Sequence, residues 1–204
     1  MNTQALGFHG IRNAKYCKRG ETAGTVTSIP YTKNIALNAL FESVDQYAND
    51  KLILQIPRDR GYDGELGVTA PDPALDKALG YQLDGTVGNI KVGAVKQDRF
   101  DLYYEMTMEQ SGGAKLRKVW LYNVQLGKGA ENTSTDAESI EFGSYTYPIR
   151  VFGTPLMAAT GDAEYVDSDG MGRTAYMIYA DPDDDGYDTF GNTVPAAKIK
   201  AQGA

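Results

Sequence analysis

The stretch from Lys118 to Phe152 constrains the fold most, because two apolar runs flank a polar, glycine-broken connection. Each run alternates apolar and polar residues, as expected of a half-buried strand. The first run places its apolar set on one face, and the second changes phase at Gly143-Ser144, where a β-bulge is expected. The sets are Trp120, Tyr122, Val124 and Leu126, then Ile140 and Phe142, then Tyr145, Tyr147, Ile149 and Val151. The pattern predicts two antiparallel strands with a long loop between them.

The clearest single strand is Phe100–Glu109, where apolar and polar residues alternate throughout. One face is apolar, and the other holds Asp101, Tyr103, Glu105, Thr107 and Glu109. The sequence Ser111-Gly112-Gly113 predicts a turn into the strand Leu116–Leu126, which makes a hairpin. The ordinary interpretation of the acidic face is a solvent-exposed face of an outer sheet.

Weaker strand patterns occur elsewhere in the chain, at Gly7–Lys18, Ile35–Val44, Lys51–Ile56, Leu66–Ala70 and Thr86–Val95. Asn49-Asp50 predicts a turn, and Pro57 is expected to end the strand before it. Pro57–Gly67 lacks periodicity and predicts a solvated loop. With 23 Gly and 14 Tyr, the composition is typical of an antiparallel β protein.

One helix is predicted, at Pro71–Gly80. Asp72 is a good N-cap, Pro73 suits the first helical position and Gly80 ends the helix. So short a helix does not persist alone in water, so its apolar stripe must lie on the sheet. We therefore predict an all-β fold, a β-sandwich or partly closed barrel with one short α-helix packed on it.

The net charge, the hydropathy and the cysteine count argue against several classes of protein. The formal charge of -7 argues against tight, non-specific DNA binding, and no apolar run is long enough to span a membrane. The chain start does not resemble a signal peptide. Cys17 is the single cysteine, which excludes an internal disulfide. A chain of 204 residues predicts one domain at 1–152, with 153–204 either completing or decorating it.

Catalytic and metal-binding patterns are weak. His9 is the single histidine, so a Cys-His or Ser-His-Asp arrangement would have to use it, and no motif accompanies it. Asp181, Asp183 and Asp185 with Gly186 match the start of a calcium loop. The twelfth position is Asn192 rather than the required Glu, so a solvated acidic turn is favoured. We expect no enzyme activity and no cofactor.

The chain resembles a known family in its strand Val119-Trp120-Leu121-Tyr122, its polar loop and its acidic segment ending Ser139-Ile140-Glu141-Phe142. A strand, loop and segment of this kind, followed by an aromatic-rich strand, are similar to the major tail (tail tube) proteins of long-tailed, non-contractile phages, the phi13-type major tail protein family. The resemblance extends more loosely over residues 7–152, and related proteins have a leucine-bearing helix where the helix is predicted here.

The resemblance implies a structural virion protein that forms hexameric rings, which stack into the tail tube and conduct DNA. Its implied partners are further copies of itself and the tape-measure, tail-terminator and tail-tip proteins, with DNA as a passenger only. It implies assembly in the host cytoplasm and residence in the virion tail. An arm at Glu42–Gly67 would contact a neighbouring subunit, and the polar connection after Leu126 is a second contact candidate. The contact candidates are Arg58, Asp59, Arg60, Tyr62, Asp63, Glu131, Asp136 and Glu138.

In such a ring the Lys118–Phe152 strands become a paired edge between subunits. Asp101, Glu105 and Glu109 could line the bore, where like charge would let DNA pass without adhering. Two alternatives come from other classes of protein. A calcium-assisted carbohydrate-binding β-sandwich would account for the tyrosines, and a small hydrolase would depend on His9.

Overall fold

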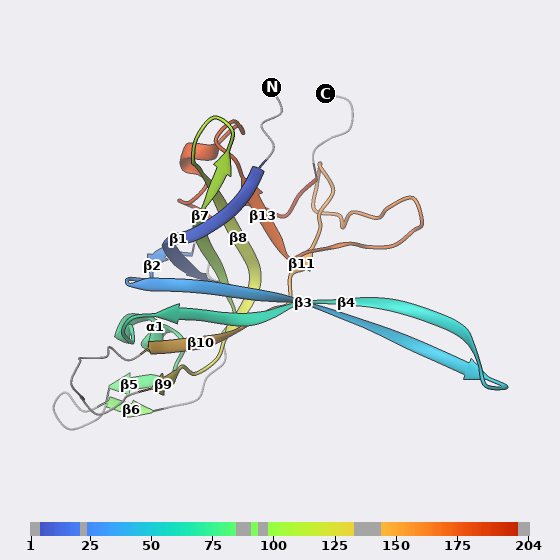
Figure 1. Cartoon of the computed structure of the whole chain (residues 1–204), viewed down its shortest axis with the longest axis horizontal. Helices are drawn as coiled ribbons and strands as arrows, with labels where there is room; N and C mark the ends of the chain where they lie inside the picture. Colours follow the sequence, from blue (N-terminus) through green and yellow to red (C-terminus); the bar gives the residue numbers. More distant parts are fainter. Residues whose placement is uncertain (1–4, 21–23, 85–90, 94–97, 133–143, 200–204) are drawn as a thin grey trace.

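The computed structural model describes residues 5–20, 24–84, 91–93, 98–132 and 144–199, and these are mostly antiparallel β-structure (Figure 1). None of the described helices is long and apolar enough to cross a membrane. The longer strands are β1 (Ala5–Lys18), β3 (Thr32–Ala48), β4 (Lys51–Val68), β7 (Phe100–Gln110), β8 (Lys115–Leu126), β10 (Ser144–Val151) and β13 (Met177–Ala180). The short ones are β2 (Thr27–Ser28), β5 (Gln82–Asp84), β6 (Lys91–Gly93), β9 (Ala130–Asn132), β11 (Thr154–Pro155) and β12 (Thr174–Ala175).

The main sheet has the order β2-β1-β7-β8-β10-β4-β3, with β13 added to β8 and β9 to β10. It curls so that β1 comes close to β3, but the two strands are not hydrogen-bonded to each other. The prediction of a sandwich-like all-β fold is confirmed, and the barrel is not closed. Strands β8 and β10 are interior, so the expectation that Lys118–Phe152 forms an edge is wrong for the described part of that stretch.

The main core lies between the two halves of the curled sheet, and α1 (Pro73–Ala78) closes one end of it. Asp72 caps α1 by accepting a hydrogen bond from the Ala74 amide, and Leu75 and Leu79 are fully buried. The predicted helix is confirmed in position, cap and packing face. In β10 alternate residues are buried, as the periodicity predicts; they are Tyr145, Tyr147, Ile149 and Val151.

A β-bulge in β8 overturns one prediction about side-chain orientation. Phe100 of β7 lies opposite Val124, but Leu102 lies opposite Leu121, so Tyr122 and Asn123 together face one residue of β7. Asn123 has a φ of 54°, a left-handed conformation that asparagine tolerates better than most residues. The bulge shifts the phase of the strand at this point.

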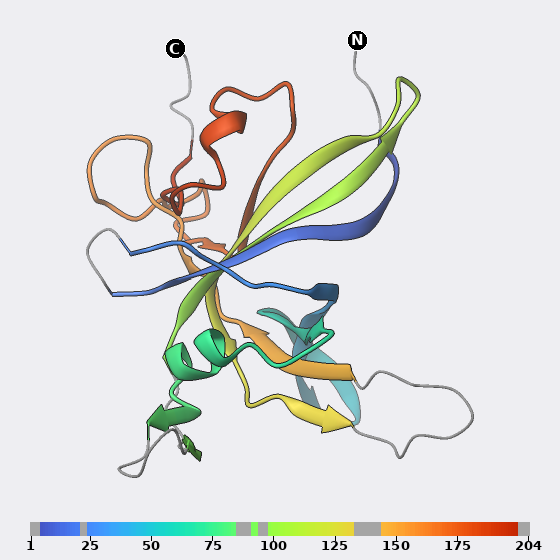
Figure 2. The ribbon, with the colours of Figure 1, turned by 90° about the vertical axis from the view of Figure 1, so that its left-hand side faces the viewer.

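As a result, Trp120 and Tyr122 point to one side of the sheet, where they donate hydrogen bonds to carbonyl oxygens of the C-terminal segment, residues 176–199. Val124 and Leu126 belong to the main core on the other side. Trp120 packs instead with Cys17 and Tyr103 in a second, smaller cluster. The expectation that all four residues share one face is wrong. The second cluster is covered by the C-terminal segment, beside β7 and β8 in Figure 2.

Candidate assembly surface

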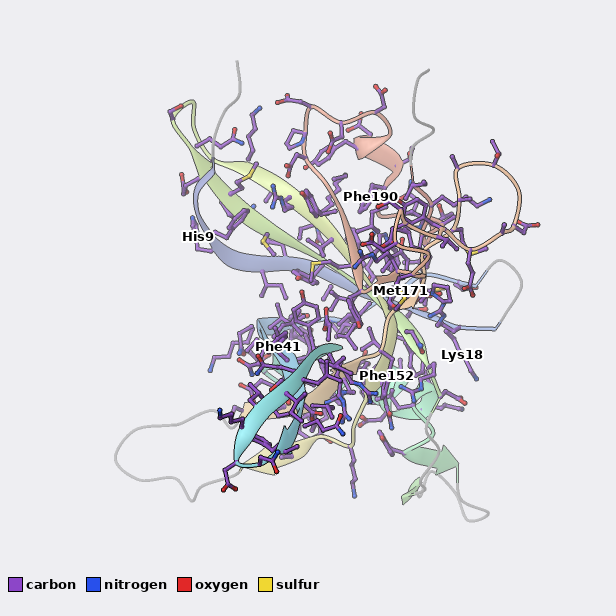
Figure 3. The ribbon with its side chains drawn as sticks, turned by 90° about the vertical axis from the view of Figure 1, so that its right-hand side faces the viewer. His9, Lys18, Phe41, Phe152, Met171 and Phe190 are labelled. Atoms are coloured by element: carbon purple, nitrogen blue, oxygen red, sulfur yellow. The ribbon has the colours of Figure 1, made fainter. Side chains whose placement is uncertain are left out.

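The most exposed apolar surface is the outer part of the β3–β4 hairpin, which we call the arm and define as residues 41–59. It projects beyond the body of the protein in Figure 1, and Phe41 is labelled on it in Figure 3. Its two-residue turn has positive φ at both central positions, 50° at Asn49 and 60° at Asp50, as a tight hairpin requires. The predicted turn is confirmed. Strand β4 continues through Pro57 to Val68, so the predicted strand end and solvated loop are wrong.

Both faces of the arm carry large apolar side chains that are 44% to 71% exposed. Cross-strand register places Val44, Leu54 and Ile56 on one face and Phe41, Tyr47 and Leu52 on the other. A core residue needs a covering layer, and a two-stranded ribbon has none of its own. Soluble monomers rarely expose contiguous apolar patches of this kind, and such patches mark interaction sites. The arm therefore has the properties of a surface that is completed by a partner.

The base of the arm packs tightly against β10 and the C-terminal segment. Gly61 has a φ of +85°, and a Cβ there would overlap the carbonyl oxygen of Val151 and lie 2.9 Å from the Tyr176 ring. That ring makes an edge contact with Tyr62, at 5.9 Å between centroids. The Tyr176 hydroxyl also donates a hydrogen bond to the Asp59 carbonyl oxygen. These contacts hold the arm against the body where it leaves the sheet.

The acidic face of β7 is not open to solvent, contrary to the expectation for its first half. Asp101 and Glu105 are 6% and 7% exposed, because the opposite face of the sheet is covered as well. Glu105 accepts hydrogen bonds from Tyr103 and from Asn13, which give its buried carboxyl oxygens polar partners. Glu109 is only half-buried. A role of Asp101 and Glu105 as bore lining is incompatible with this burial, and Glu109 stays a candidate.

Asp101 is held by polar groups that stabilise its ionised form in part. It accepts a hydrogen bond from the Asn123 amide at 2.8 Å, and its carboxylate lies 3.7 Å from the Arg19 guanidinium. Burial nevertheless raises the pKa of Asp101 above its usual range, against the opposing effects of Asn123 and Arg19. This carboxylate therefore supports the β8 bulge at a cost in desolvation.

Two of the three aspartates considered as weak calcium candidates, Asp181 and Asp183, pair with cationic side chains of β8. Arg117 donates to both carboxylate oxygens of Asp181 at 2.7 Å, and this raises the pKa of Arg117. Lys115 donates to Asp183 at 3.2 and 3.3 Å, while Asp185 is exposed. Among the described residues, which include this whole loop, no three potential ligands are placed to hold a metal ion. The loop fastens the C-terminal segment to the sheet.

The single histidine and the single cysteine do not come together. His9 and Cys17 lie opposite Thr107 and Asp101, six residues apart on β7, which corresponds to roughly 20 Å along a strand. His9 shares a hydrogen bond of 2.8 Å with Glu109 on the surface, whereas Cys17 is buried. His9 is labelled on β1 in Figure 3. The hydrolase alternative therefore has no Cys-His pair to use.

The residues predicted to contact a neighbouring subunit fall in separate places. Arg58, Asp59 and Arg60 are exposed at the base of the arm, where Arg60 pairs with Glu42 at 3.0 Å. Tyr62 and Asp63 are half-buried just beyond them. Glu131 is in β9, opposite Tyr145, and Asp136 and Glu138 lie outside the described residues. Their role in assembly stays a prediction.

The apolar residues of the arm were not predicted as a site, because the sequence pattern was interpreted as two ordinary strands. A signal for them was present: the run Leu52-Ile53-Leu54 is apolar in both phases. A strand of that kind is normally buried on both faces. Next to a two-residue turn, it has no sheet of its own chain to cover either face.

No family model matches the chain, and no curated protein matches it. A chain in the cryo-EM structure of the anti-feeding prophage (AFP) baseplate, 6-fold symmetrised, is similar to it, with 12% sequence identity and a TM-score of 0.39. The match covers 74% of this chain and 93% of that chain. A TM-score of that size is too low to support a statement about function.

Proposed function

We propose that this chain is a structural protein of a phage tail, the major tail tube subunit, which assembles into stacked hexameric rings around a DNA-conducting bore. The observation that carries the self-assembly is the arm, whose two apolar faces have no cover within the described chain. The assignment to a phage tail and to a ring of six subunits rests on the sequence resemblance. The subunit acts through its contacts and uses no chemically reactive residue.

Two free strand edges support assembly by addition of backbone. Within the described residues, the outer side of β3 carries no strand, and β2 covers β1 only at Lys15 and Tyr16. Unpaired edges present rows of amide and carbonyl groups that a monomer must protect and an oligomer can pair. Assembly would consume these edges together with the apolar faces of the arm.

The proposed partners are further copies of this chain along the tube, and the tape-measure, tail-terminator and tail-tip proteins at its ends. DNA is a transient passenger in the bore. The subunit would be made and assembled in the host cytoplasm and reside in the virion tail. The calcium part of the carbohydrate-binding alternative is weakened, because Asp181 and Asp183, two of its three calcium candidates, are paired with Arg117 and Lys115.

The test is electron microscopy and sedimentation of the purified chain over a range of salt and protein concentrations. Rings or tubes are expected for the unaltered chain, and loss of them for a variant with Phe41→Ser and Ile53→Ser in the arm. Both side chains are more than 60% exposed, so the variant should keep the fold of the monomer. A chain that stays monomeric throughout, with or without the substitutions, would contradict the proposal.

A further inference from the structure

We infer that a groove between β1 and β3 is the acceptor for the arm of a second copy of this chain. The inference rests on the proposed self-assembly and assigns to it a specific docking site. The groove lies where the curled sheet stays open, between the two strands that approach without pairing. Its walls include Phe8, Ile11, Lys33, Ile35, Tyr104 and Met106.

The size and lining of the groove suit protein side chains rather than a small ligand. Its volume is about 240 Å³, below the roughly 300–1,000 Å³ of typical ligand sites. The walls are mainly apolar, with Phe8 47% exposed at the mouth. An aromatic or branched aliphatic side chain is the kind of group that such a space desolvates well. Phe41, Tyr47 and Ile53 of the arm are groups of this type.

Backbone groups on both sides of the groove are available for a strand. On β1, residues 7–13 have β7 on one side and, within the described chain, no strand on the other. Among the described residues, no strand covers the outer side of β3 there either. An extended segment that enters the groove can pair with such an edge while its alternate side chains fill the apolar walls. The arm offers extended strands with exposed apolar residues on both faces.

Charge favours the same pairing. The arm carries four acidic residues and two basic ones, with Asp45, Asp50 and Lys51 near its tip. Among the described residues, the groove lining contains no carboxylate, and Lys33 in it and Arg12 beside it are exposed cations. An arm with an excess of acidic residues is therefore attracted to these two cations before the apolar faces meet. A contact between two grooves or between two arms would lack this charge complementarity.

The arm extends away from the body in Figure 1, so its tip does not reach the groove of its own chain. Each copy is consequently a donor through its arm and an acceptor through its groove. A head-to-tail contact of this kind generates a closed ring or an open filament, depending on the rotation between subunits.

The test mixes two defective chains. The arm variant carries Phe41→Ser and Ile53→Ser and keeps its groove. The groove variant carries Phe8→Glu and Lys33→Glu, both at exposed positions, and keeps its arm. A control with Met171→Glu and Lys198→Glu makes the same charge change at exposed positions away from the groove. Circular dichroism and thermal unfolding check that all variants remain folded, and Lys33→Glu alone provides a milder groove variant.

Sedimentation velocity is expected to show the arm and groove variants as monomers under conditions in which the unaltered chain and the control assemble. An equimolar mixture should form a heterodimer, through the single intact arm and the single intact groove, and no larger species. Lys33→Glu alone should weaken assembly, and more at low salt than at high salt.

The two proposals fail in distinguishable ways. Assembly of the groove variant as readily as the unaltered chain would overturn the acceptor site while the proposed function stands. A mixture that stays monomeric, although the unaltered chain assembles, would also overturn the acceptor site alone. Both proposals would be overturned if the unaltered chain never assembles and the mixture of the two variants also shows no heterodimer.

Discussion

Replacement of Gly61 by alanine tests whether the base of the arm is tightly packed. Gly61 has a φ of +85°, a region where an L-residue costs about 1–2 kcal/mol. The new methyl group would also overlap the Val151 carbonyl oxygen and lie 2.9 Å from the Tyr176 ring. Overpacking of this kind costs about 1–3 kcal/mol. The free energy of unfolding should therefore fall by about 2–5 kcal/mol in total.

Gly186→Ala is the matched control, because Gly186 has a φ of +80° and nothing lies within 4 Å of the added Cβ. Its free energy of unfolding should fall only by the backbone cost of about 1–2 kcal/mol. Both substitutions reduce the entropy of the unfolded chain equally, so that contribution cancels in the comparison. The difference between the two variants measures the steric overlap at the base of the arm.

Equilibrium unfolding in urea, at a concentration where the chain is monomeric, gives both values from the shift in the transition midpoint. Gly61→Ala should be destabilised clearly more than Gly186→Ala. Equal losses in the two variants would show that the Val151 and Tyr176 contacts leave room for a methyl group. Tight packing at Gly61 would then not be what fixes the direction of the arm.

Three further predictions concern the helix cap, a buried carboxylate and the C-terminal segment. Asp72→Ala should lower the free energy of unfolding by about 1 kcal/mol in urea titrations, because the cap of α1 is lost, and Asp72→Asn should lower it much less. The folded-state pKa of Asp101 is raised, so its contribution to stability is greatest below its usual pKa of 3.8 and falls as the pH rises through the folded value. Asp101→Asn should therefore gain stability relative to the unaltered chain over that pH range, and a constant difference would be evidence against a raised pKa. Arg117→Ala should speed amide hydrogen exchange in β13 while leaving β10 protected, since it removes both hydrogen bonds to Asp181.

Features encoded within a few neighbouring residues could be predicted from the sequence. Asp72 followed by Pro73 specifies the start of α1, and Asn49-Asp50 specifies the hairpin turn, because each depends on local backbone geometry. The strand that begins at Phe100 was predictable because apolar and polar residues alternate along its whole length. These features required no knowledge of what packs against them.

Features that depend on distant partners could not be predicted. Asp101 and Glu105 have the pattern of a solvent-facing strand, but segments far away in sequence cover them. Glu105, for example, is satisfied by Asn13, 92 residues earlier. The bulge at Asn123 likewise depends on the hydrogen bond from its amide to Asp101. Alternation reports only which positions share a face, and not whether that face is covered.

Pro57 was expected to end a strand, and the structure explains why it does not. It lies in the two-stranded part of the hairpin, where the outer side of β4 is a free edge among the described residues. A proline can occupy such a strand, because no ladder exists on that side for it to interrupt. The continuation of β4 through Pro57 thus needed tertiary information that periodicity alone does not contain.

The contact between Tyr176 and the base of the arm also sets an order of events during synthesis. The Tyr176 hydroxyl reaches the carbonyl of Asp59, a residue that leaves the ribosome 117 residues earlier. Until that late segment emerges, the arm lacks its support and the Trp120 cluster lacks its cover. A nascent chain can therefore form the hairpin early but cannot hold it in its final direction.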